Sequence, residues 1–325
     1  MKAFIRKVIF YLVTIWAAVT LNFFIPRLMP GDPVQAIVAR YQGAISGDAM
    51  EALYKLFGLD KQTSAWTQYW AYWNQLLHGD LGLSFRYYPT SVASIIGQAL
   101  PWTICLVGLS TVIAFTLGSL AGVLLGWRRG RASEVAIPLA TFFSAVPYFW
   151  IALIFISFFG VKLSILPMYG SYSAGLVPSW HWDFIASVLS HAIMPALTIV
   201  ISSIAGWILS MRNMMMTVSS EDYVTVAQAK GLPESRVMFG YAARNAVLPQ
   251  ISGFALSLGF VVSGSLVMEQ VFTYQGIGFQ LLSAVGSNDY PLMQGIFLVI
   301  TLSVIMANIL ADVVYAILDP RTRGV

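Results

Sequence analysis

Residues 219–233 read SSEDYVTVAQAKGLP and form a polar island between two long apolar runs. Ser219 and Asp222 have the spacing of a capping box, so the sequence predicts a short helix that begins here. Gly231 is placed to end that helix, because glycine takes the left-handed backbone conformation at little cost. Pro233 suits the first turn of a second helix, where its missing N–H has no helical partner in any case. Two short helices joined at a fixed elbow would form a rigid docking element. An ordinary loop with fraying helices is the alternative.

The composition is that of an integral membrane protein. Apolar residues make up 58% of the chain and charged residues 10%, with a mean hydropathy of +0.75; soluble domains are about half apolar and about a quarter charged. The net charge is +4, but the basic residues stand in small groups beside apolar runs, which indicates orientation in a membrane and not nucleic-acid binding. The single cysteine, Cys105, excludes an intrachain disulfide, and its apolar neighbours predict a buried side chain.

Six apolar runs predict an all-α protein with six transmembrane helices. Each run approaches or exceeds the roughly 20 residues that a helix needs to cross the hydrocarbon core. The first run has no clear cleavage site after it, which favours a spanning helix over a signal peptide. Pro138 and Pro147 predict kinks in the third run. The runs cover approximately residues 8–25, 100–127, 135–161, 188–211, 248–268 and 292–318.

These runs define three parts of the chain and its sidedness. Residues 1–28 are the N-terminus and first helix, 29–99 a long extracytoplasmic loop region, and 100–325 a core of five helices. Placing both termini, the 128–131 cluster and the whole polar stretch 212–246 around the island in the cytoplasm puts 12 of the 18 Lys and Arg residues there. The other six are spread over longer outer segments, as the positive-inside rule expects.

Two sequence patterns point to packing or contact surfaces. Gly118, Gly122 and Gly126 recur every four residues and predict the close approach of another helix. Within the outer loop region an aromatic stripe shares one helical face, at Trp66, Tyr69, Trp70 and Trp73. Three interpretations of this stripe stay open: a place at the lipid headgroups, contact with a partner protein, or a small core within the loop region itself.

The sequence carries no signature of an enzyme. It contains no GxxxxGK[ST] phosphate loop, HExxH or GxSxG, so we expect no ATP hydrolysis by this chain alone. Two carboxylates, Glu269 and Asp312, lie within or at the end of spanning runs. They could serve a proton relay or contact substrate. We favour positions near helix ends, where each carboxylate reaches water or an arginine.

Around the polar island the sequence resembles the permease subunits of binding-protein-dependent ABC importers of type I fold, in the oligopeptide, dipeptide and nickel class. The segments 221–224 (EDYV), 227–232 (AQAKGL) and 244–249 (RNAVLP) look like that class's form of the EAA loop. Thr225 and Val226 stand where the generic loop has its Glu and first Ala. Further segments resemble the family in the same order along nearly the whole chain, at 27–33 (RLMPGDP), 79–84 (GDLGLS), 289–291 (DYP) and 318–321 (LDPR).

The resemblance implies one subunit of an ATP-driven importer in a bacterial or archaeal plasma membrane. Its partners would be a homologous second permease, two ATP-binding subunits that carry ATP and Mg, and an extracytoplasmic substrate-binding protein. This chain itself would bind no cofactor, metal or nucleic acid. Residues 212–248 would form the coupling loop that docks in a cleft of an ATPase. The coupling residues implied in this way are Glu221, Asp222, Tyr223, Ala227, Ala229, Lys230, Gly231, Leu232, Arg244 and Asn245.

Peptides are the expected substrate, with oligosaccharides, nickel and glutathione as alternatives. Trp180 and Trp182 in an outer segment could stack on sugar rings, contact the binding protein or face the bilayer. A more distant alternative is a proton-coupled secondary transporter that uses Glu269 and Asp312; a membrane enzyme or scaffold is less favoured still. A translocation path along the fifth helix is expected to involve Gly253, Gly259, Ser263, Gly264 and Glu269.

Overall fold

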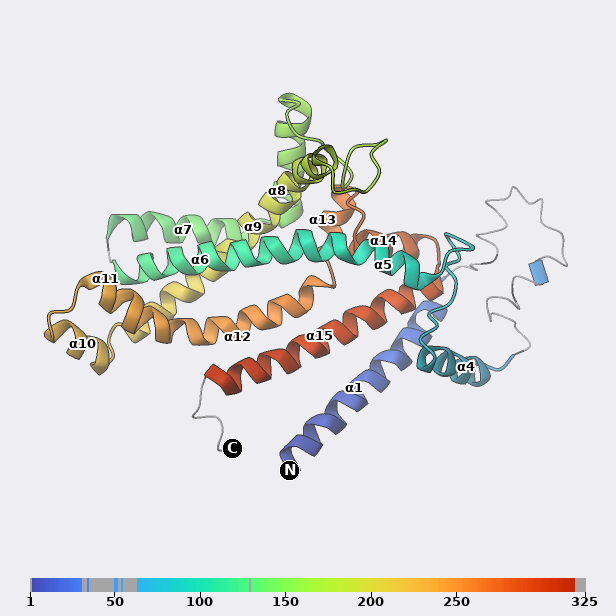
Figure 1. Ribbon diagram of the computed structural model, residues 1–325, viewed down its shortest axis with the longest axis horizontal. Coiled ribbons are helices and arrows are strands. Elements are labelled where there is room, and N and C mark those ends of the chain that lie inside the picture. Colours follow the sequence, from blue (N-terminus) through green and yellow to red (C-terminus); the bar gives the residue numbers. More distant parts are fainter. Residues whose placement is uncertain are drawn as a thin grey trace. The chain divides into compact units, whose positions relative to one another are not determined.

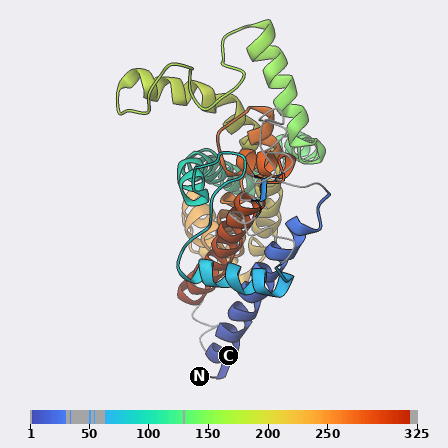
Figure 2. The ribbon, with the colours of Figure 1, turned by 90° about the vertical axis from the view of Figure 1, so that its right-hand side faces the viewer.

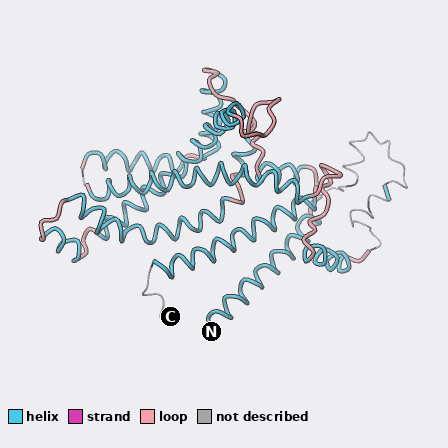
Figure 3. The backbone as a smooth tube through the Cα atoms, viewed as in Figure 1, coloured by secondary structure: helices cyan, strands magenta, loops and turns pink. Residues whose placement is uncertain are grey.

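The computed structural model describes residues 2–30, 34, 50, 51, 54, 63–128 and 130–318. Helices make up most of this part of the chain, and the extended pairing within it is limited to one isolated antiparallel bridge between Leu83 and Ser91 (Figure 3). The chain divides into two compact units. The first comprises Met1–Trp102 and Gln275–Ile305, and the second comprises Thr103–Tyr274 and Met306–Val325.

The first unit contains a helix of the outer loop region that crosses the end of the first spanning helix. Its elements are α1 (Lys2–Arg27), α4 (Ala65–Leu77), most of α5 (Val92–Thr103), α14 (Ile277–Gly286) and the start of α15 (Tyr290–Leu318). Tyr69 of α4 hydrogen bonds through its hydroxyl to the Thr20 hydroxyl of α1 at 2.8 Å, and its ring centroid lies 5.3 Å from that of Phe23. Accordingly, α4 lies across α1 in Figure 2.

The aromatic stripe of α4 therefore divides into two groups. Tyr69 is buried against α1, which accounts for that residue by packing within the unit. Trp66 and Trp70 instead stay about two-thirds exposed, at 66% and 65%. Their rings are available for the headgroup region or for a partner protein, the two other interpretations of the stripe.

A buried carboxylate joins two segments that are far apart in the sequence. Asp289 is fully buried and accepts hydrogen bonds from the Ser84 hydroxyl, from Arg86 N at 2.9 Å and from Leu292 N at 3.2 Å. The Tyr87 hydroxyl also donates to Gln280 Oε1 at 3.1 Å. The 79–84 and 289–291 segments, quoted separately above, therefore meet at one place in the first unit.

The second unit contains the remaining helices. They are η1 (Ile104–Gly108), α6 (Leu109–Trp127), α7 (Arg131–Ala145), α8 (Tyr148–Phe155), η2 (Ile156–Lys162), α9 (Trp182–Val218), α10 (Asp222–Ala229), α11 (Glu234–Arg236), η3 (Val237–Ala243), α12 (Arg244–Val261) and α13 (Leu266–Val271). Helices α6 and α9 lie side by side (Figure 1). The glycine stripe of α6 faces α9 along this contact.

The closeness of α6 and α9 depends on the missing side chains of the stripe. A Cβ atom built on Gly118, Gly122 or Gly126 would lie 2.6 Å from a Cβ of α9, and each would also meet a backbone carbonyl oxygen at 2.7 to 2.9 Å. The three Cβ atoms belong to Trp207, Met211 and Met215. Any larger residue in the stripe would push the two helices apart.

Within the described residues, fewer helices meet the length and hydropathy expected of a membrane span than the six that the sequence predicts. Four helices are long and apolar enough to cross a membrane, at residues 5–27, 92–127, 182–218 and 290–310. A fifth is added if the bent pair Ser133–Ala145 and Tyr148–Lys162, with a 92° bend, is one span. α12 has 18 residues, Arg244 and Asn245 among them, and is not one of these helices. The count of six crossings stays a prediction.

Two of the local predictions differ from the structure. The third run breaks at Pro147, where a kink was predicted, whereas α7 continues past Pro138 to Ala145, so that the kink predicted at Pro138 stays a prediction. Helix α5 begins at Val92, so residues 92–99 of the predicted loop region are helical. Cys105 is exposed, and the prediction that it is buried is wrong. Apolar neighbours do not imply burial in a membrane helix, because one face can meet lipid or another chain.

Candidate functional site

The polar island begins differently from the prediction. Ser219 is the C-cap of α9, and its hydroxyl donates to Met216 O at 3.0 Å. The next helix, α10, starts at Asp222 after Glu221, whose side chain makes no capping hydrogen bond. The capping box predicted at Ser219 is therefore wrong. α9 extends past its apolar run because Met215 and Val218 in its last turn are buried, and this packing outweighs the local capping signal.

The elbow after α10 has the predicted geometry. Gly231 has a φ of +72°, and its N–H donates to Gln228 O at 2.9 Å. A Cβ atom at Gly231 would meet nothing within 4 Å, so the backbone conformation requires glycine here and the available space does not. Pro233 is the N-cap of α11, one residue before the first turn in which it was expected.

Buried side chains hold this pair of short helices against the ends of α6 and α9. Val224 and Ala227 are the two buried residues of α10. Trp127 Nε1, at the end of α6, donates to Glu234 Oε1 of α11 at 2.9 Å. The cluster beneath the helices comprises Val123, Met211, Met215, Val218, Val224, Ala227, Val237, Met238, Ala242, Ala243 and Ala246. The segment is thus a supported element with a packed underside.

Most of the expected coupling residues lie on the solvent side of this element. Ala227 is an exception, because it is 2% exposed and packs into the cluster, and Leu232 is partly buried against the same cluster. Val226 was not among the expected residues, yet it is 52% exposed and stands one turn from Tyr223, which is 38% exposed. Their three-residue spacing on α10 is the sequence signal for this small apolar patch. The exposed coupling residues are Glu221, Asp222, Tyr223, Ala229, Lys230, Gly231, Arg244 and Asn245.

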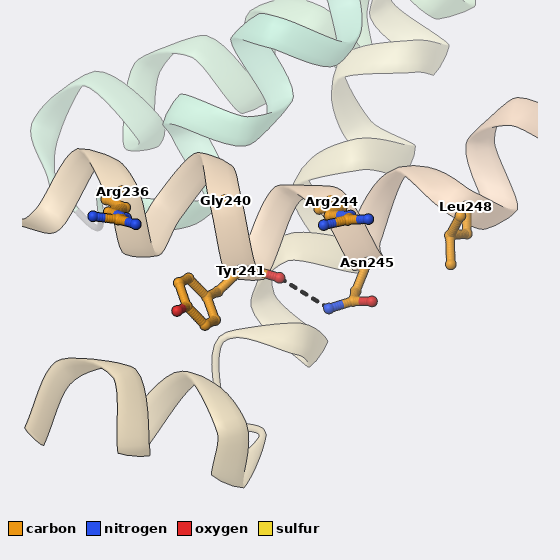
Figure 4. Close-up of a pocket in the computed structure, with 6 residues that line it drawn as sticks. All are labelled: Arg236, Gly240, Tyr241, Arg244, Asn245 and Leu248. Carbon is orange, nitrogen blue, oxygen red and sulfur yellow. Dashed lines mark hydrogen bonds between the residues drawn. The ribbon is translucent and has the colours of Figure 1, made fainter. Parts of the chain in front are cut away.

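A recess of about 690 Å³ opens beside α10, on the solvent face of η3 and the start of α12. Figure 4 shows Tyr241 and Asn245 on one side of the helical segment, with the Asn245 Nδ2 donating to Tyr241 O at 2.9 Å. The lining residues are Arg236, Gly240, Tyr241, Arg244, Asn245 and Leu248. They fall at positions 236, 240–241, 244–245 and 248, so that each group begins three or four positions after the end of the one before, and the buried residues of the same segment alternate with them on the opposite face.

Only some of the residues that line the recess were predicted from the sequence. Arg244 and Asn245 belong to the expected coupling residues, whereas Arg236, Tyr241 and Leu248 do not. The intervening η3 is a π-helical segment, in which the backbone is wider than in an α-helix. A spacing rule based on 3.6 residues per turn cannot place residues across such a segment.

The recess is electropositive. Both Arg236 and Arg244 are exposed, and neither forms an ion pair within the part of the chain that the structure describes. The lining residues include no carboxylate. An arginine guanidinium offers five N–H donors in a planar fork that matches carboxylate and phosphate groups. The lining is therefore suited to binding an anionic group.

The residues expected along a translocation path differ in exposure. Gly253 is exposed, 3.8 Å from Trp207 at its built Cβ position, whereas Gly259 is buried. Ser263 and Gly264 form the turn after α12, in which Gly264 has a φ of +69°. These residues do not form one exposed lining within this chain.

The position of Glu269 also differs from the one expected from the sequence. It is fully buried in α13, and the Thr103 hydroxyl donates to its Oε1 at 2.8 Å. The favoured position near water is therefore wrong for this residue, because the chain turns at Gly264 and α13 packs against α8. The side chain of Asp312 lies outside the described residues.

Most of the chain matches a known family of transport proteins. Residues 118–324 match the family described as binding-protein-dependent transport system inner membrane component. This match covers the glycine stripe, the coupling element and the recess.

Curated relatives match over nearly their whole length. The chain is similar to the oligopeptide transport system permease protein AppB of Bacillus subtilis, with 31% identity over 98% of both chains. It is 34% identical to the di/tripeptide transport system permease protein DppB of Pseudomonas aeruginosa over 99% of both. It is 29% identical to the glutathione transport system permease protein GsiC of Pectobacterium atrosepticum over 98% of both.

Proposed function

The chain belongs to the family of binding-protein-dependent transport system inner membrane components, and from this premise we propose that it is the permease subunit of an ATP-driven peptide importer. It is a multi-pass membrane protein of the ABC permease class. Relatives over nearly the full length are named as oligopeptide and di/tripeptide permeases, which supports peptides as the substrate class. Oligosaccharides are the second candidate, supported only by the exposed Trp180 and Trp182.

Energy for transport comes from other chains. The sequence has no phosphate loop, so two ATP-binding partner subunits supply and hydrolyse ATP with its Mg. An extracytoplasmic binding protein delivers the peptide, and a homologous second permease supplies the other half of the path. This chain binds no cofactor of its own.

The observation that carries the proposal is the supported element at α10. Its buried side fixes it to the ends of α6 and α9, while Tyr223 and Val226 are exposed on the outer side. A rigid element of this kind transmits a displacement of the ATPase to two long helices. Closure of the ATPase dimer would thereby switch the permease between inward-facing and outward-facing states.

Reconstitution of the complete transporter tests this function. The permease pair, both ATPase subunits and the binding protein are placed in proteoliposomes, and uptake of a labelled tripeptide is measured together with phosphate release. We expect uptake that requires both ATP and the binding protein and that persists when a protonophore collapses the proton gradient. Excess unlabelled oligosaccharide should not compete. Uptake that follows the proton gradient without ATP would instead establish the proton-coupled alternative.

The α10 contact has its own test in the same system. Val226→Asp places a charge in the exposed apolar patch, and we expect it to abolish retention of the ATPase subunits and peptide uptake. Thr225→Asp, at an exposed neighbouring position outside the patch, is the matched control. Wild-type retention and uptake in both variants would show that α10 does not contact the ATPase.

A further inference from the structure

The recess beside α10 contains positive charge that no described residue neutralises. Arg236 and Arg244 stand two turns apart on one face, with Gly240 between them. Gly240, which adds no side chain to the lining, lies on the helical segment between the two arginines (Figure 4). Two arginines in one recess repel each other, and the attraction of both to an anion between them would offset that repulsion.

The shape of the recess favours a protein side chain over a small ion. Its volume of about 690 Å³ is many times that of one carboxylate, so the site accommodates a segment of chain that carries the charged group. Tyr241 and Asn245 add a phenol and an amide to the lining, and Leu248 adds an apolar side chain. Such a mixed lining suits an acidic side chain together with its own aliphatic stem.

The position of the recess indicates which partner supplies that side chain. α10 packs against η3, the segment that carries Gly240 and Tyr241 of the recess lining. A partner that covers the solvent side of both α10 and η3 would therefore also extend over the recess. Under the proposed function that partner is an ATP-binding subunit.

We propose that the recess receives an acidic side chain, Asp or Glu, of the docked ATP-binding subunit, which pairs with Arg236 and Arg244. This inference rests on the proposed function and adds a polar contact to the apolar one at α10. The apolar patch would supply affinity, whereas the arginine pair would fix the orientation of the ATPase and accelerate its association. Arg244 begins α12, so an ion pair here also links the ATPase directly to that helix.

The test measures ATPase binding to the assembled permease pair in nanodiscs of neutral phosphatidylcholine. The variants are Arg236→Glu, Arg244→Glu and the double substitution, each at an exposed position. Each single reversal should weaken binding about tenfold at low salt, and the wild-type affinity should fall as salt rises while that of the double variant does not. A variant with both Arg236→Lys and Arg244→Lys should retain most of the binding to the ATPase.

Arg131→Glu is the matched control, because Arg131 is an exposed arginine at the start of α7 and outside the recess. A second arm replaces the acidic residues of the ATPase docking face one at a time with lysine. One of these substitutions should restore binding to the double Arg-to-Glu variant, which identifies the partner carboxylate.

The outcomes separate the possible ligands. If both arginine variants bind the ATPase with wild-type affinity and salt dependence, the inference is overturned, while the loss of binding in Val226→Asp would leave the proposed function standing. If the variants differ from wild type only in nanodiscs that contain phosphatidylglycerol, the recess binds a lipid phosphate and the inference is likewise overturned. Normal binding by Val226→Asp as well would count against the α10 contact itself.

Discussion

Gly122 shows how a single hydrogen atom in place of a side chain sets the distance between two membrane helices. A Cβ atom there would lie 2.6 Å from Met211 Cβ and 2.7 Å from Ile208 O, and the carbonyl oxygen belongs to backbone that cannot rotate away. We predict that Gly122→Ala destabilises the second unit by about 1–3 kcal/mol. The measurement is the apparent unfolding temperature of the purified protein in detergent.

Gly206→Ala is the control for this prediction. Gly206 lies in α9, where an added Cβ would meet nothing within 4 Å. Alanine should be neutral there or gain about 0.5–1 kcal/mol from better helix propensity. An unfolding temperature that falls equally in both variants would assign the effect to glycine in general and remove the argument from close packing.

Asp289 is the residue on which the 79–91 segment of the first unit depends. Asp289→Ala would leave Arg86 N, Leu292 N and the Ser84 hydroxyl without their acceptor, and each lost bond to a charged group costs about 1.5–3 kcal/mol. We predict that the segment opens and that trypsin then cleaves after Arg86, which is exposed. Mass spectrometry of the fragments reports the cleavage. Asp183→Ala, an exposed acid in the first turn of α9, should leave this site resistant.

At the scale of elements, the elbow between α10 and α11 is the most specific geometric requirement. A β-branched residue at a φ of +72° is strained by about 1–3 kcal/mol. We therefore predict that Gly231→Val reorients α10 and raises the ATP hydrolysed per peptide imported several-fold, while the permease still assembles. Phosphate release and peptide uptake measured in the same proteoliposomes give this ratio.

An asparagine variant of Gly231 distinguishes the effect of backbone strain from the effect of adding a side chain. Gly231→Asn should stay close to wild type, because asparagine tolerates the left-handed region and nothing lies within 4 Å of the added Cβ. Wild-type coupling in the valine variant, or equal loss in both variants, would contradict the elbow model.

The elements also show what could be predicted from the sequence and why. The glycine stripe and Gly231 were predictable because each depends on a strong local constraint, the absence of a side chain. The start of α10 was not, since the buried Met215 and Val218 extend α9 through a position with good capping residues. The recess was only half predictable, because the π-helical η3 changes the spacing that brings Arg236 into line with Arg244.

At the scale of the whole molecule, the bent pair decides the sidedness of the second unit. Ser133–Ala145 and Tyr148–Lys162 meet at 92°, which fits either one broken span or a re-entrant loop. The arginines at 128, 129 and 131 precede the pair, whereas its other end carries one basic residue, Lys162 itself, and residues 163–181 before α9 contain no Lys or Arg. Under the positive-inside rule this asymmetry places the two ends of the pair on opposite sides of the membrane, so the pair should cross it once.

Cysteine labelling checks this prediction directly. In a Cys105→Ser background, single cysteines replace Gly130 before the pair, Ala174 after it and Thr225 on α10, all three of which are exposed. A membrane-impermeant maleimide should label the cysteine at position 174 in intact cells, and those at 130 and 225 only after the membrane is opened. The α9 span separates positions 174 and 225 in either model. Position 130 is therefore the discriminating one: if it is labelled from the same side as 174, the pair is re-entrant and the predicted count of crossings falls with it.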